Sequence, residues 1–264
     1  MLKRELKINF KSLILWTIIL AITYIAVFLI YPSLMNEQSA QSMKTMIESM
    51  PQEMLSAFNM DIVGIESAYG WFKTEGFIFL TLIGGLYAAI MGSTILLKEE
   101  NDKTIEFLYS KPISRNNIVS SKILCGILNI TLFTGIITIS NYIFLNMAED
   151  FDTKQFFMIS LLPILLYYML FFITLFISTF LKKNRKSMSL AIALVFVSYL
   201  MQVIGSMGKS TEIFKQLSLF EFVSSRYIIL NDGFDMKYII IGIAIILISV
   251  IGTYVRYNKK EFQV

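Results

Sequence analysis

Six long runs of apolar residues constrain the fold of this chain more than any other feature. They cover residues 13–30, 76–97, 123–145, 156–181, 187–207 and 238–255, and none contains Asp, Glu, Lys or Arg. A helix needs about 20 mostly apolar residues to cross a bilayer, and a backbone in hydrocarbon must satisfy its own hydrogen bonds. The runs also lack the alternation of barrel strands. The sequence therefore predicts an all-α polytopic membrane protein with six transmembrane helices in a single domain, residues 1–264.

Lys and Arg gather in the connections on one side of the predicted membrane. These are Lys3, Arg4, Lys7, Lys11, Lys98, Lys103, Lys111, Arg115, Lys122, Lys182, Lys183, Arg185, Lys186, Arg256, Lys259 and Lys260. Such residues accumulate on the cytoplasmic side of bacterial membrane proteins. We therefore expect a multi-pass protein of the bacterial cell membrane with both termini in the cytoplasm. The net charge of +4 reflects this orientation and indicates no nucleic-acid partner.

The same orientation places the connections 32–75 and 208–237 outside the cell. The first holds apolar residues at helical spacing, which are Met43, Met46, Ile47, Met50, Met54, Leu55 and Phe58. We expect these stretches to be interfacial helices, acting either as a substrate entrance or as a cap over the helix ends. The connection 208–237 is too apolar for a solvated loop and fits a partial re-entrant helix pair with a turn at Asp232-Gly233.

The cytoplasmic connection 98–117 is the most distinctive segment. Residues 98–115 read Lys-Glu-Glu-Asn-Asp-Lys-Thr-Ile-Glu-Phe-Leu-Tyr-Ser-Lys-Pro-Ile-Ser-Arg. Ile105, Leu108 and Tyr109 fall on one face of a short helix, and Pro112 ends it, because a proline disfavours helical geometry in the residue before it. The product is a short amphipathic helix, which fits either a membrane-surface helix or a docking helix.

No group of residues in the chain indicates catalysis. There is no histidine and one cysteine, Cys125, so a zinc or haem site is not expected. Residues 208–211 imitate the end of a phosphate-binding loop but lack its first glycine. The apolar runs contain no ionisable pair for a proton relay or a membrane enzyme. We expect no catalytic residue, no metal and no cofactor in this chain.

Two patterns of uncharged residues lie within the apolar runs, one of polar side chains and one of small side chains. Thr131, Thr134, Thr138 and Asn141 form one stripe on the third helix. The stripe could line a substrate path, although such residues more often hydrogen-bond to a neighbouring helix or to their own backbone. Gly84, Ala88 and Gly92 recur every four residues on the second helix and predict a close-packing face. That face could pack within the subunit or against a second one.

The connection 98–117 resembles the cytoplasmic loop of the ABC-2 family of ABC export permeases. The residues that carry the resemblance are Glu99-Glu100, Thr104, Leu108, Ser110-Lys111-Pro112, Ser114-Arg115 and Lys122. Asp102-Lys103 depart from the family pattern, since many members have a Gly beside the Thr. The six spans and the long first outer connection are also similar to the family plan. Residues 50–58 look like the outer loop of a subgroup with copper-site maturation, bacitracin-resistance and peptide-export permeases.

The resemblance implies a coupling helix that docks onto a separate ATPase subunit. The coupling residues would be Glu99, Glu100, Thr104, Ile105, Leu108, Tyr109, Pro112 and Arg115. It further implies two ATPase copies that hold the ATP and Mg, and a second permease chain in a homodimer or heterodimer. The expected function is export of an amphipathic peptide, antibiotic or lipid-like molecule; the Met-rich outer connection favours an apolar substrate. The alternative is a mechanotransmitting partner that relays ATPase motion to an extracytoplasmic protein without bulk transport.

Overall fold

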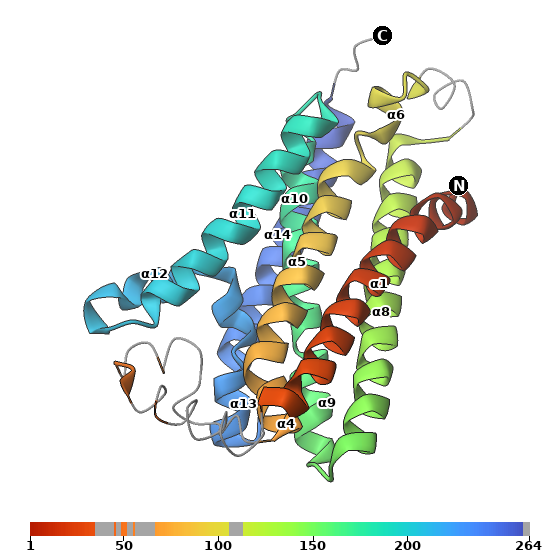
Figure 1. The fold of residues 1–264 in the computed structure, drawn as a ribbon. Coiled ribbons are helices and arrows are strands. Elements are labelled where there is room, and N and C mark those ends of the chain that lie inside the picture. The colour runs from red at the N-terminus through yellow and green to blue at the C-terminus, as the bar shows by residue number, and fades with distance from the viewer. Residues whose placement is uncertain (35–44, 46–48, 52–54, 56–66, 106–112, 261–264) are drawn as a thin grey trace.

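The computed structural model describes residues 1–34, 45, 49–51, 55, 67–105 and 113–260, and these form helices and connections without a strand. The longer helices run side by side as one bundle (Figure 1). The elements are α1 Leu2–Leu34, α4 Ala68–Trp71, η1 Phe72–Gly76, α5 Phe77–Ile95, α6 Lys98–Asn101, α8 Arg115–Ala148, α9 Thr153–Leu161, α10 Pro163–Ser178, α11 Asn184–Gly205, η2 Lys209–Thr211, α12 Glu212–Leu217, η3 Leu219–Val223, α13 Ser225–Asn231 and α14 Met236–Asn258.

Six helices in this part of the chain are long and apolar enough to cross a membrane. They are α1, the continuous helix α4–η1–α5, α8, the pair α9–α10, α11 and α14. The prediction of an all-α polytopic membrane protein is therefore confirmed.

Several helices extend beyond the apolar runs. The first begins at Leu2, the second at Ala68, and α8 spans 34 residues, a length of about 51 Å against a hydrocarbon core of about 30 Å. Polar residues continue a helix outside hydrocarbon because water satisfies the backbone and side chains there. The last residues of the expected connection 32–75 are therefore helical, and the last residues of the expected connection 98–117 form the start of α8.

The centre of the bundle is the contact between α5 and α10. The Tyr167 hydroxyl on α10 donates a 2.7 Å hydrogen bond to the carbonyl of Leu80 on α5. Pro163 starts α10 and has no N–H to donate to the turn before it, which separates α10 from α9. Tyr87, Phe133 and Phe171 are buried side chains around this contact, and they join α8 to it.

The segment between α11 and α14 folds back onto the bundle. Phe220 and Val223 of η3 are buried in a cluster with residues of α5, α10 and α11. The Ser218 hydroxyl donates a 2.7 Å hydrogen bond to the carbonyl of Ser198 on α11, and a side chain at Gly205 would overlap the backbone of Lys215. Asp232 then turns the chain with a φ of 49°. The apolar character of this segment reflects packing against the bundle.

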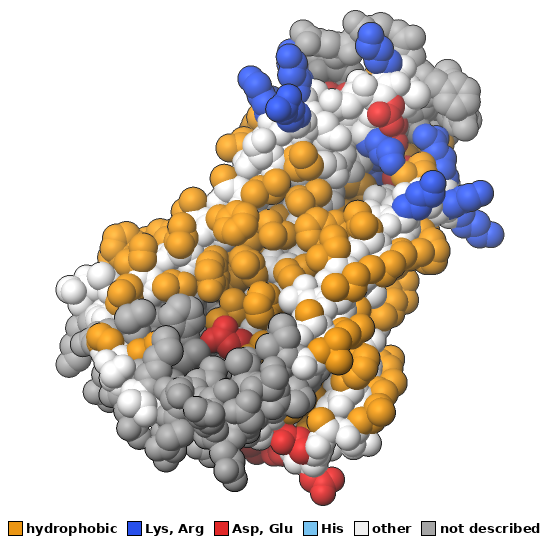
Figure 2. Space-filling model, viewed as in Figure 1, with side chains coloured by type: hydrophobic (Ala, Val, Ile, Leu, Met, Phe, Trp, Pro, Cys, Tyr) orange, Lys and Arg blue, Asp and Glu red, His pale blue; other side chains and the backbone are white. Residues whose placement is uncertain are grey.

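The side chains at the two ends of the bundle differ in charge (Figure 2). We define the basic end as the end with residues 1–11, 96–105, 113–122, 179–187 and 256–260, and the acidic end as the opposite one, with residues 67–75, 149–155 and 208–238. The start of α1, the end of α14 and α6 lie at the basic end in Figure 1. Between the ends, α1, α8, α11 and α14 expose large apolar side chains, which suits contact with lipid.

Candidate coupling site

At the basic end, the described residues of the predicted coupling connection contact α8, the start of α11 and the end of α14. The short helix α6 follows α5 after a tight turn at Leu96-Leu97, both of which are buried. The turn places both glutamates of α6 at the basic end of the bundle. What these carboxylates contact decides what a partner protein could reach.

Glu99 points into the bundle and pairs with a lysine of α8. The Nζ of Lys122 lies 2.8 and 3.0 Å from the two carboxylate oxygens of Glu99, and it also donates a 2.5 Å hydrogen bond to the carbonyl of Ile95. The Lys122 side chain is fully buried and that of Glu99 is 4% exposed. A buried ammonium needs such partners, since removing a charge from water is costly. The pair therefore fixes α6 to α8.

Glu5 on α1 is the third member of this cluster. One of its carboxylate oxygens lies 3.6 Å from the Nζ of Lys122, and its side chain is 1% exposed. Neither oxygen accepts a hydrogen bond within the described part of the chain. Lys122 thus has two carboxylates within ion-pair distance, one on α1 and one on α6. We call Glu5, Glu99 and Lys122 the buried ion cluster.

Glu100 forms a second ion pair, with the last described residue of the chain. The Nζ of Lys260 lies 2.6 Å from a Glu100 oxygen, and both side chains are at most 10% exposed. The same ammonium donates a 3.0 Å hydrogen bond to the carbonyl of Leu181, just after α10. The pair connects α6 to the ends of α10 and α14.

Arg115 holds the end of α14 from the first turn of α8. Its Nη1 atom lies 2.8 Å from the carbonyl of Asn258 and 2.9 Å from that of Lys260, with that of Tyr257 at 3.4 Å. A helix end leaves its last carbonyls without partners, so a guanidinium there both donates hydrogen bonds and neutralises the negative end of the helix dipole. Ser114 caps the start of α8 itself.

The residues between these anchors form an exposed turn. Asn101, Asp102, Lys103 and Thr104 are exposed, and Lys103 has a φ of 53°. The Thr104 N–H donates a 2.9 Å hydrogen bond to the carbonyl of Glu99, which closes the turn. Ile105 is buried. The remaining coupling residues, Leu108, Tyr109 and Pro112, lie outside the described residues.

Of the expected coupling residues that the structure describes, Thr104 is thus the exposed one. Glu99, Glu100 and Arg115 bind other parts of the same chain and connect the exposed turn to the spans. Sequence reasoning missed Glu5, Lys260 and the role of Lys122 in this arrangement. A signal existed for Glu5, which is a single acidic residue within the basic segment Lys3–Lys11.

The polar stripe on α8 lies mostly in the packed interior. Thr134, Thr138 and Asn141 are at most 5% exposed, and the Thr134 hydroxyl donates a 2.9 Å hydrogen bond to the carbonyl of Ile130 on its own helix. Thr131 is exposed and lies 2.7 Å from the hydroxyl of Tyr168 on α10. Bonds of both kinds are those of a packing stripe. A substrate path along it stays a prediction.

The small-residue face of α5 packs against α10 of the same chain. A side chain at Gly84 would overlap the ring of Tyr167, and one at Gly92 would overlap the backbone of Phe171. Ala88 is fully buried. This face is therefore occupied within the subunit.

No group of three or more His, Cys, Asp or Glu side chains that could hold a metal occurs among the described residues. In the comparison with known families, the family described as "ABC-2 family transporter protein" matches residues 2–262. No curated protein and no solved structure matches the chain.

Proposed function

Because the chain belongs to the ABC-2 family of transporter proteins, we propose that it is the permease subunit of an ABC exporter, driven by a separate ATPase subunit. The proposed mechanism rests on one observation at the basic end. An exposed turn at residues 101–104 is connected there by buried ion pairs to α1, α8 and α14. A force on the turn therefore acts on three spans at once.

The proposed orientation has both termini and the exposed turn in the cytoplasm of a bacterial cell. Its support is the gathering of Lys and Arg at this end of the bundle. In this arrangement the ATPase binds the turn, supplies ATP and Mg, and hydrolyses ATP, while the chain itself remains without catalytic residues. Two ATPase copies and a second permease chain, identical or similar, complete the assembly.

The proposed substrate is an amphipathic or hydrophobic molecule such as a peptide, an antibiotic or a lipid-like compound. Its support is the resemblance of residues 50–58 to the subgroup of copper-site maturation, bacitracin-resistance and peptide-export permeases. The ion-paired basic end suits ATP-driven re-packing of the spans, and outward transport is the direction that this family resemblance favours.

The test is a pull-down of the tagged full chain from native membranes in mild detergent, followed by mass spectrometry. We expect an ATPase in about one copy per permease chain, since two of each complete an ABC transporter. The test variant exchanges the charges of the turn, Asp102→Lys with Lys103→Asp. The matched control exchanges the charges of another exposed pair, Lys154→Asp with Asp232→Lys at the acidic end. Asp232, like Lys103, has a left-handed backbone conformation.

Loss of the ATPase in the turn variant and its retention in the control support the docking position. Recovery of an exported protein without any ATPase would overturn the exporter proposal and favour a mechanotransmitting partner. Equal recovery from both variants would remove the exposed turn as the docking position.

A further inference from the structure

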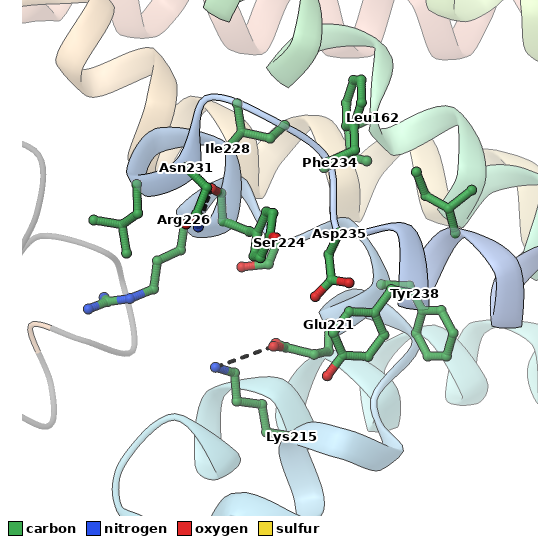
Figure 3. Close-up of a pocket in the computed structure, with 14 residues that line it drawn as sticks. Leu162, Lys215, Glu221, Ser224, Arg226, Ile228, Asn231, Phe234, Asp235 and Tyr238 are labelled. Carbon is green, nitrogen blue, oxygen red and sulfur yellow. Dashed lines mark hydrogen bonds and ion pairs between the residues drawn. The ribbon is translucent and has the colours of Figure 1, made fainter.

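The acidic end contains a pocket that the coupling mechanism does not use. It has a volume of about 170 Å³ and is formed by η3, α12, α13, the start of α14 and Leu162 between α9 and α10 (Figure 3). Its charged lining residues are Lys215, Glu221, Arg226 and Asp235, and aromatic and aliphatic side chains share its apolar lining equally.

Two carboxylates line this pocket and are compensated unequally. One Glu221 oxygen lies 3.3 Å from the Nζ of Lys215, and the other accepts a 3.0 Å hydrogen bond from the Gln202 amide. Asp235 caps α14 by accepting a 3.0 Å hydrogen bond from the N–H of Lys237. The guanidinium of Arg226 extends away from both carboxylates in Figure 3. Among the described residues, Lys215 is the one cation within ion-pair distance of these two carboxylates.

The electrostatics of Glu221 agree with this geometry. Burial raises the pKa of its carboxyl, and the charge of Asp235 acts in the same direction, against the opposing effects of Lys215 and Gln202. Two carboxylates that interact in this way gain stability when a cation binds between them. A cationic ligand would add to the charge of Lys215, and Lys237, whose Nζ lies 5.9 Å from the Tyr238 ring centroid, is another ammonium beside this pocket.

Aromatic rings make the pocket more suitable for an organic cation than for a metal. Phe222 and Tyr238 pack edge to face with their ring centroids 5.2 Å apart, and Tyr227 and Phe234 complete the wall. Aromatic faces attract ammonium groups. A metal would need more acidic ligands than the described residues bring together.

The size and the rim of the pocket indicate how much of a ligand enters it. Small-molecule sites usually exceed about 300 Å³, so this pocket holds one headgroup of a larger molecule. Its rim is apolar and open, since Leu230 is 58% and Phe234 40% exposed, and the adjacent Met236 is 61% exposed. The remainder of such a ligand would lie along this apolar surface, as a hydrocarbon tail does.

We infer that this pocket binds the primary ammonium group of an amphiphilic molecule, with the tail along the exposed residues of α13 and α14. The inference rests on the proposed function where it names this amphiphile as the class of exported substrate. Binding itself does not depend on the ATPase. An aminolipid and an exported amine share this chemistry.

The test uses the purified full chain in neutral maltoside micelles. The probe is dodecylammonium with a photoreactive diazirine in its chain, and the matched probe is the corresponding dodecanol. Labelled residues are mapped by mass spectrometry over a range of probe concentrations. The variants Glu221→Gln and Asp235→Asn remove one charge each, and asparagine keeps the helix cap of α14. Asp232→Asn is the control, an exposed acid at the same end.

We expect saturable labelling at the rim, at Tyr227, Leu230 or Phe234, by the ammonium probe and not by the alcohol. Each pocket variant should weaken apparent affinity about tenfold, as loss of a charged hydrogen-bond partner does, while Asp232→Asn leaves it unchanged. Equal labelling by the two probes, or unchanged affinity in Asp235→Asn, would overturn the inference. Asp235→Asn carries this test even where Glu221→Gln disturbs folding.

Two further measurements separate the ligand sources and the two proposals. Displacement of the probe by phosphatidylethanolamine assigns the pocket to a lipid headgroup, and resistance to displacement assigns it to a single-chain amine. Stimulation of the partner ATPase by dodecylammonium would support an exported substrate. Saturable labelling without stimulation would keep the binding site and remove the substrate assignment, whereas the pull-down tests the ATPase partnership separately.

Discussion

Replacing Lys122 with methionine leaves Glu5 and Glu99 buried without the ammonium that both now approach. The side chains of all three residues are at most 4% exposed, so water cannot substitute for the lost cation. Methionine is similar in length and fills the same space, and the substitution therefore changes charge more than packing. We expect Lys122→Met to be strongly destabilising.

The expected magnitude follows from the burial of the cluster. Removing one partner of a buried ion pair costs about 3–5 kcal/mol, because the remaining charge stays uncompensated. For a chain of this size, 1 kcal/mol lowers the melting temperature by about 2–4 °C. The melting temperature should therefore fall by about 6–20 °C. The triple variant Glu5→Gln, Glu99→Gln, Lys122→Met should recover most of this loss, since it leaves no buried charge.

The assay is thermal unfolding of the purified chain in detergent, followed by size-exclusion chromatography of the protein that stays folded. Lys154→Met is the matched control, because Lys154 pairs with Asp232 at 2.7 Å while both side chains are more than half exposed. Its loss should change the melting temperature little, because an exposed ion pair contributes little to stability. A melting temperature of Lys122→Met equal to that of Lys154→Met would refute the reasoning, and so would a triple variant less stable than Lys122→Met.

Three further substitutions test other contacts. Gly92→Ala should destabilise the chain by about 1–3 kcal/mol through overpacking against α10, measured as a lower melting temperature than that of Gly135→Ala, where a new Cβ meets no atom within 4 Å. Arg115→Gln should speed amide hydrogen exchange at the end of α14 and leave exchange at the centre of α14 unchanged, because the carbonyls that Arg115 contacts lie at that end. Exchange at the end of α14 as slow as in the wild type would contradict the capping role. Burial raises the pKa of the Glu221 carboxyl above its ordinary value of 4.5. The carboxyl therefore makes its stabilising contribution below about pH 4.5 and loses it as pH rises through the higher folded value. The melting temperature of wild type relative to Glu221→Gln should therefore fall with rising pH, and a constant difference would count against a raised pKa.

The spans could be predicted from the sequence, and their ends could not. An apolar run of about 20 residues has one stable arrangement in a bilayer, which made the six crossings readable. Beyond the hydrocarbon, helix and loop differ little in free energy, and tertiary packing decides between them. That is why the second helix begins at Ala68 and the first at Leu2.

In the candidate site, too, some features could be predicted from the sequence and others could not. The pattern Gly84, Ala88, Gly92 predicted close packing, and it is α10 that occupies the face. The glutamates of α6 were found from the sequence, but their burial was not, because it depends on Lys122 and Lys260, which approach from distant positions in the chain. Periodicity describes one helix at a time, whereas ion pairs between helices depend on how the helices pack.

The buried ion cluster has a property that an apolar contact at the same place would lack. Lys122 lies 2.8 Å from Glu99 on α6 and 3.6 Å from Glu5 on α1. An ammonium shared by two carboxylates can change its nearer partner through a small displacement without entering water. Coupling between distant sites is carried by elements with two discrete arrangements, and an ammonium shared in this way is one such element. The turn at residues 101–104 joins one carboxylate and the first span carries the other, so movement of the turn changes the balance between the two pairs. In the proposed coupling mechanism, the cluster would transmit motion from the exposed turn to the spans.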